Sequence, residues 1–89
     1  MVIFVIERAP ESLRGELTRW LLEVKPGVLI GSVNTSIREQ LWDRITSLSL
    51  DALLVYSTNN EQGFDILSTG NPYRSVVEYD GLKLIKTLK

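Results

Sequence analysis

The sequence contains no cysteine and no histidine among its 89 residues. Structural zinc sites, thiol nucleophiles and catalysis by a histidine base are therefore excluded. A bound metal would have to be a hard cation, Mg²⁺ or Mn²⁺, held by carboxylate and carbonyl oxygens. The chain also lacks an apolar run of the roughly 20 residues that cross a bilayer, and its start lacks a basic signal-peptide segment. We expect a cytoplasmic protein without a membrane segment.

The chain carries little excess charge, with 10 basic and 11 acidic residues and a net charge of −1. A bulk electrostatic attraction to nucleic acid is missing, so DNA or RNA binding would require arginines gathered on one face. A length of 89 residues predicts one domain, residues 1–89. Because so short a chain buries only a modest core, a homodimer is a reasonable expectation.

The first half of the chain alternates between strand and helix patterns. Residues 2–6 predict a strand buried on both faces, and Pro10 suits the first position of a helix. Helical spacing over residues 12–25 places five apolar side chains on one face: Leu13, Leu17, Trp20, Leu21 and Val24. Lys25-Pro26-Gly27 ends this helix, and residues 28–33 predict a single bent strand. Trp20 is accordingly expected in the core.

The second half begins with a helix over residues 34–48, capped either by Ser36 with Glu39 or by Asn34. Strands are predicted over residues 52–58 and 64–68, followed by a C-terminal extension over residues 76–89. In this extension Asp80-Gly81 is a hairpin signal. The residues after Gly81 have lysines three positions apart, as in a helix, and alternating leucines, as in a strand. We assign this last run to a strand.

The predicted order is β-α-β-α-β-β with the C-terminal extension. Two helices on one face of a small, mainly antiparallel sheet make an α+β sandwich, and a ferredoxin-like domain is the nearest common architecture. That fold has a hairpin between its helices, whereas residues 27–34 leave room for one bent strand.

Uncommon motifs occur along the whole chain. The longest, L-R-G-x-L-x-x-W-L-L-E-V, runs from Leu13 to Val24. Shorter motifs are G-V-x-x-G from Gly27, I-R-E-x-x-W from Ile37, T-N-x-x-x-G-F from Thr58 and D-G-L-x-L from Asp80. In these motifs the chain resembles the CRISPR-associated Cas-two family in its type I-E form.

The resemblance implies a ferredoxin-like homodimer that works with the Cas-one integrase in capturing new spacers. The small dimer would sit between two integrase dimers, carry the duplex part of the protospacer DNA and leave strand transfer to its partner. Cas-two proteins are also described as Mg²⁺-dependent nucleases for RNA or DNA, which makes an endonuclease the alternative. A third possibility is a small-molecule-sensing dimer, because this fold serves many roles.

Glu7 directly follows the first predicted strand and occupies the position of the family's candidate catalytic acid. Two copies of Glu7 across a dimer twofold could hold Mg²⁺, whereas one carboxylate binds it poorly. No second acid adjoins Glu7 in the sequence, and the neighbouring Arg8 disfavours a metal. We therefore treat Glu7 as a candidate metal ligand and catalytic residue of the alternative function; the scaffold role requires no cofactor.

Arg14 and Arg74 occupy positions that, by the resemblance, contact the DNA backbone. Ser12 and Tyr73 stand where relatives can have further arginines, so the basic patch is thinner here. Arg8 could compensate, and so could Arg38, which lies near the start of the second helix. For partner binding, the resemblance points to the apolar C-terminal side chains Leu82, Leu84, Ile85 and Leu88.

Overall fold

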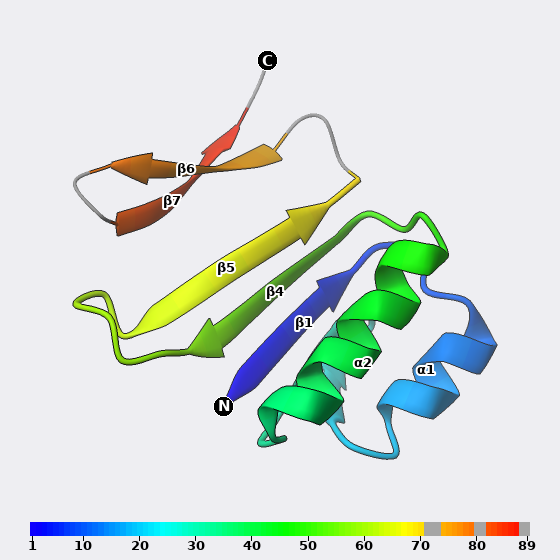
Figure 1. Cartoon of the computed structure of the whole chain (residues 1–89). Coiled ribbons are helices and arrows are strands. Elements are labelled where there is room, and N and C mark those ends of the chain that lie inside the picture. The colour runs from blue at the N-terminus through cyan, green and yellow to red at the C-terminus, as the bar shows by residue number, and fades with distance from the viewer. Residues whose placement is uncertain (71–73, 80–81, 88–89) are drawn as a thin grey trace.

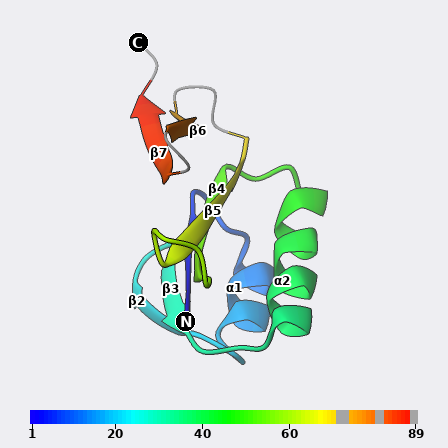
Figure 2. The same ribbon diagram turned by 60° about the vertical axis from the view of Figure 1, so that its left-hand side comes forward.

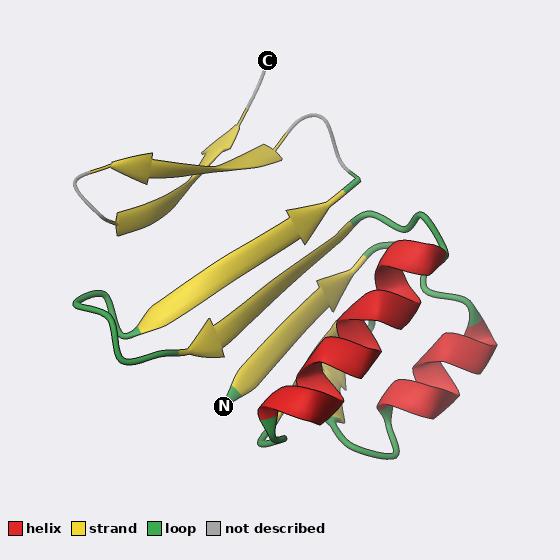
Figure 3. Ribbon diagram, viewed as in Figure 1, coloured by secondary structure: helices red, strands yellow, loops and turns green. Residues whose placement is uncertain are grey.

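Two helices cover one face of a five-stranded sheet in the computed structural model, which describes residues 1–70, 74–79 and 82–87 (Figures 1 and 3). Every strand pair is antiparallel, and the sheet order is β2-β3-β1-β4-β5. The elements are β1 (Val2–Ile6), α1 (Glu11–Leu17), β2 (Leu22–Lys25), β3 (Val28–Gly31), α2 (Thr35–Ser47), β4 (Ala52–Ser57), β5 (Phe64–Thr69), β6 (Arg74–Tyr79) and β7 (Leu82–Thr87). The predicted α+β, ferredoxin-like fold is confirmed.

The core lies between the helices and the sheet, with β1 at its centre. Alternate residues of β1 are buried against the helices, as the period of two in a strand requires. The core comprises Val2, Phe4, Ile6, Leu13, Leu17, Leu21, Leu29, Leu41, Ile45, Ala52 and Leu54. Ile3 and Val5 point to the opposite face and are only partly buried. The prediction that β1 is buried on both faces is therefore wrong for the single chain.

The sheet face opposite the helices is also apolar. The strand registers align one row across all five strands: Leu22, Ile30, Ile3, Val55 and Ile66. No described helix covers this face, which Figure 2 shows from the side. At the β2 edge Leu22 is 68% exposed, so part of the row is left in contact with solvent. We call this surface the open sheet face.

The first helix ends earlier than its apolar spacing predicts. Helix α1 stops at Leu17, the chain turns, and Leu22–Lys25 form an edge strand that pairs with β3. The prediction of a helix over residues 12–25 is wrong because hairpin pairing with β3 outweighs the helical pattern. Trp20 is consequently 50% exposed instead of lying in the core. The β2–β3 hairpin also replaces the predicted single bent strand and completes the ferredoxin-like arrangement.

The second half of the chain agrees with its predicted elements within about two residues. Asn34 caps α2, since its side-chain oxygen accepts the Ile37 N–H at 2.8 Å. Leu48, the last residue of the predicted helix, follows the last residue of α2 and is 39% exposed. Strands β6 and β7 form an antiparallel hairpin beside β5, which confirms the assignment of the last run to a strand (Figure 1). Residues 80–81, the predicted turn, lie outside the described residues.

Candidate nucleic-acid interface

A surface depression of about 470 Å³ opens where β1 ends. Its lining comes from the β1–α1 connection, from α1 and from the β2–β3 turn, and includes Glu7, Arg8 and Arg14. Three of the residues predicted as site residues are therefore brought together. Arg8 has a left-handed backbone (φ 57°), which is uncommon for a residue other than glycine and marks a sharp change of direction after β1.

The floor of the depression depends on a close approach between Gly27 and the end of β1. The Ile6 N–H donates a hydrogen bond of 2.8 Å to the carbonyl oxygen of Gly27. Gly27 has φ 81°, and a β-carbon at this position would overlap the carbonyl oxygen of Ile6. Only glycine meets both requirements without displacing its neighbours. In the sequence Gly27 marks a predicted helix end, and no local pattern indicates its contact with Ile6.

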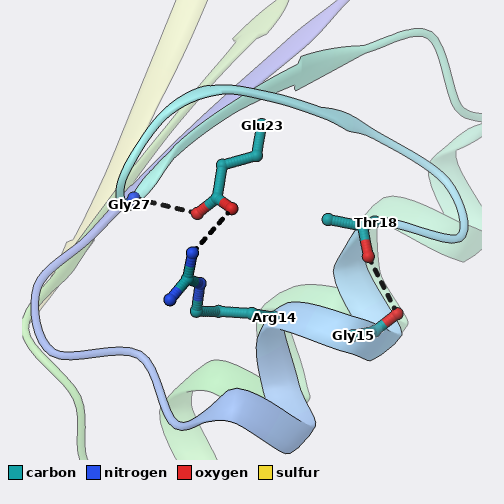
Figure 4. Close-up of polar contacts among 5 residues, drawn as sticks. All are labelled: Arg14, Gly15, Thr18, Glu23 and Gly27. Atoms are coloured by element: carbon teal, nitrogen blue, oxygen red, sulfur yellow. Dashed lines mark hydrogen bonds and ion pairs between the residues drawn. The ribbon is translucent and has the colours of Figure 1, made fainter.

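Arg14 is anchored at the depression by a carboxylate that the sequence reasoning also missed. Glu23 Oε1 contacts Arg14 Nη2 at 2.9 Å, and Glu23 Oε2 accepts the Gly27 N–H at 3.1 Å (Figure 4). The hydrogen bond from Arg14, and next that from Gly27, lower the pKa of Glu23 below its ordinary value. The same ion pair raises the pKa of Arg14. The ion pair thus places the Arg14 guanidinium beside Glu23 at the surface of the protein.

Helix α1 is short, and its last turn is closed by side-chain and backbone contacts. The Thr18 hydroxyl donates to the Gly15 carbonyl oxygen at 3.1 Å (Figure 4). The Thr18 N–H donates to the Arg14 carbonyl oxygen at 2.9 Å. A second ion pair joins the other side of α1 to α2, with Arg44 Nε 3.2 Å from Glu16 Oε2. Helix α1 thus contacts β2 through Arg14 and α2 through Glu16, and the exposed pair with α2 contributes little to the position of Arg14.

Glu7 is exposed at the rim of the depression, and a second acid lies beside it in the fold. The Glu7 N–H donates to the Asp51 carbonyl oxygen at 2.9 Å, which extends the β1–β4 ladder by one residue. Asp51 is 44 positions further along the chain, so the sequence alone does not place it beside Glu7. Across the described part of the chain, no three acidic, histidine or cysteine residues gather to hold a metal ion.

The remaining predicted residues lie elsewhere. Arg38 packs on Tyr56, with its guanidinium carbon 3.9 Å from the ring centre, and Tyr56 pairs with Val2 at the opposite end of β1 from Glu7. Arg74 is the first residue of β6. The predicted partner-binding residues Leu82, Leu84 and Ile85 belong to β7, whereas Leu88 lies outside the described residues.

The order of elements and the hairpin between the helices define a ferredoxin-like α+β domain with an added C-terminal hairpin. The family described as CRISPR-associated protein (Cas_Cas2CT1978) matches residues 1–84 of the chain. The protein belongs to this Cas-two-like family, and membership supports a role in CRISPR adaptation. No helix in the described ranges has the length and apolar character needed to cross a membrane.

Proposed function

We propose that the protein is a non-catalytic, dimeric scaffold that holds protospacer duplex DNA while a Cas-one-type integrase, as in type I-E systems, performs strand transfer. The observation that carries this proposal is the anchored Arg14 guanidinium, whose side chain is 45% exposed and shares a depression with Arg8. Fixed, exposed guanidinium groups bind phosphate oxygens without reading sequence. A subunit that holds captured DNA of varied sequence needs contacts of this kind.

The open sheet face supports the dimer. Exposed apolar side chains on an uncovered sheet face are suited to an interface, and two such sheets can pack face to face about 10 Å apart. A twofold axis through the paired faces would repeat Arg8 and Arg14 on both protomers. Two copies of a weak phosphate site on one rigid body give a duplex two anchoring points.

Further contacts complete the proposed assembly. Arg38 and Arg74 are proposed to add phosphate contacts beyond the depression. The integrase would bind the C-terminal hairpin by strand addition, through Leu82, Leu84, Ile85 and Leu88. The scaffold role requires no cofactor from this chain.

The alternative is an Mg²⁺-dependent endonuclease that uses a pair of Glu7 residues across the dimer. The alignment of Asp51 beside Glu7 favours it, because two protomers could bring four carboxylates to one end of the paired sheets. Mg²⁺ held there would generate a hydroxide nucleophile from water. The scaffold proposal instead assigns Glu7 no chemical step.

Reconstituted spacer integration with the cognate integrase separates the two functions. We expect Glu7→Ala to integrate a protospacer as efficiently as the wild type, with Glu39→Ala, an exposed acid on α2, as the control for loss of one negative charge. Loss of integration by a Glu7→Ala protein that folds, dimerises and binds the integrase would contradict the scaffold proposal. Metal-dependent cleavage of RNA or DNA that disappears in Glu7→Ala would support the endonuclease.

Duplex binding tests the role of Arg14 directly. Each lost phosphate contact reduces the slope of log K against log salt by about 0.9, so Arg14→Ala should reduce it by about 2 in a dimer. Arg44→Ala is the matched control, because Arg44 is also paired with a glutamate and its side chain is 49% exposed. Equal slopes for both variants would contradict the assignment of Arg14 to DNA.

A further inference from the structure

Glu23 extends from β2 to Arg14 and Gly27, two residues that line the depression, and its contact with Gly27 fixes it independently of Arg14. In the sheet it pairs with Leu29, which is fully buried on the helix side, so the Glu23 side chain points toward α1. One carboxylate oxygen accepts the Gly27 N–H, and the side chain is only 18% exposed. The carboxylate therefore has a defined position before any cation approaches it.

Arg14 uses a small part of its hydrogen-bonding capacity in this ion pair. A guanidinium has five N–H donors in a planar fork, and the contact with Glu23 runs from Nη2 alone. Glu23 is the less exposed partner and Arg14 the more exposed one, at 18% and 45%. The carboxylate thus lies on the inner side of the guanidinium, and the remaining donors lie toward the depression and solvent.

We propose that Glu23 is a positioning residue, which holds the Arg14 guanidinium in the orientation that receives a DNA phosphate. The inference rests on the proposed function, because it presumes that Arg14 contacts DNA. Glu23 also opposes binding, since its negative charge cancels part of the field of Arg14. A phosphate on the outer side meets the guanidinium first, however, and its repulsion from the more distant carboxylate is weakened by water and salt. Because Glu23 already orders the Arg14 side chain, less conformational entropy is lost when DNA binds, and this gain outweighs the repulsion.

The test is a double-mutant cycle in duplex binding, read by the anisotropy of a short fluorescein-labelled DNA of random sequence. Glu23→Gln keeps an oxygen for the Gly27 N–H and removes the acceptor for Arg14. We expect about tenfold weaker binding, because ordering each of the two Arg14 side chains of a dimer costs roughly threefold. Added to Arg14→Ala, the same substitution should change affinity by less than about twofold.

Glu16→Gln is the matched control, because it makes the same change in charge and removes the other glutamate–arginine pair of α1. It should bind DNA as well as the wild type or slightly better. Circular dichroism of each variant reports folding, and binding is compared only among variants with the wild-type spectrum.

Three results would overturn the inference. Binding of Glu23→Gln as tight as the wild type or tighter would make Glu23 a bystander or a competitor of phosphate. A loss that persists in the Arg14→Ala background would mean that Glu23 acts through the β2–β3 turn instead. If Arg14→Ala itself binds like the wild type, the proposed contact between Arg14 and DNA fails as well, which separates failure of the proposed function from failure of the positioning role alone.

Discussion

Replacing Gly27 by alanine is expected to destabilise the protein far more than the same change at another left-handed glycine. Gly27 (φ 81°) and Gly63 (φ 85°) have nearly the same backbone conformation. An added β-carbon at residue 27 would overlap the Ile6 carbonyl oxygen, whereas at residue 63 it would have no neighbour within 4 Å. Comparing the two substitutions therefore separates the free-energy cost of the left-handed backbone conformation from that of close packing.

The magnitudes follow from three contributions. A left-handed backbone costs an alanine about 1 kcal/mol, and this is the whole expected effect at Gly63. At Gly27, weakening the 2.8 Å hydrogen bond from Ile6 adds about 1 kcal/mol. Displacing packed neighbours adds about 1 kcal/mol more. The free energy of unfolding should fall by about 3 kcal/mol for Gly27→Ala, which corresponds to a Tm lower by about 15 °C in a domain of this size.

Thermal and urea unfolding followed by circular dichroism at one fixed protein concentration measure both effects. A fixed concentration is needed because the proposed dimerisation would make Tm depend on it. Equal Tm values for Gly27→Ala and Gly63→Ala would refute the reasoning, since they would show that the β2–β3 turn does not press against the end of β1. Weakened DNA binding by folded Gly27→Ala is a further expectation, because the Gly27 N–H fixes Glu23.

Three other outcomes are expected. Asn34→Ala should cost about 1 kcal/mol of unfolding free energy in urea titrations because it removes the cap of α2, whereas Ser36→Ala, the alternative cap in the sequence, should cost much less. Since folding lowers the pKa of Glu23, its contribution to stability is present above the unfolded value of about 4.3 and is lost as pH falls through the folded pKa. The difference in urea midpoint between wild type and Glu23→Gln should therefore shrink on acidification, and a constant difference would contradict the ion pair. Val55→Lys, at the middle of the open sheet face, should shift the protein from dimer to monomer in analytical ultracentrifugation, while Gln40→Lys on α2 should leave the dimer intact.

The sequence predicted the correct helix or strand wherever the local pattern of a segment agreed with the structure that the segment adopts in the folded protein. The helix after Asn34 and the strands on either side of the turn at residues 59–63 appear within about two residues of their predicted bounds. Their apolar spacing and their turn residues point to the same elements, so no long-range contact had to override them.

The segment from Thr18 to Lys25 shows where local reasoning fails. Its leucine, tryptophan and valine spacing continues the helical stripe of Leu13 and Leu17, yet Leu22–Lys25 pair with β3. The hydrogen bonds of that hairpin come from residues further along the chain, and a helical periodicity count cannot include them. The same error placed Trp20 in the core and assigned Glu23 to a helix instead of to the edge strand β2.

In the candidate site, too, some features could be predicted from the sequence and others depend on the fold. Composition excluded histidine and cysteine chemistry, and the family resemblance singled out Glu7 and Arg14, with Arg8 added as the neighbour of Glu7, because this information resides in residue identity and order alone. The meeting of Arg14 with Glu23, of Gly27 with Ile6 and of Glu7 with Asp51 depended on the folded chain. These contacts join residues from separate elements, and their geometry is set by strand register and by helix packing over the sheet. Such distances are set only when all the elements pack together, so no local stretch of sequence can predict them.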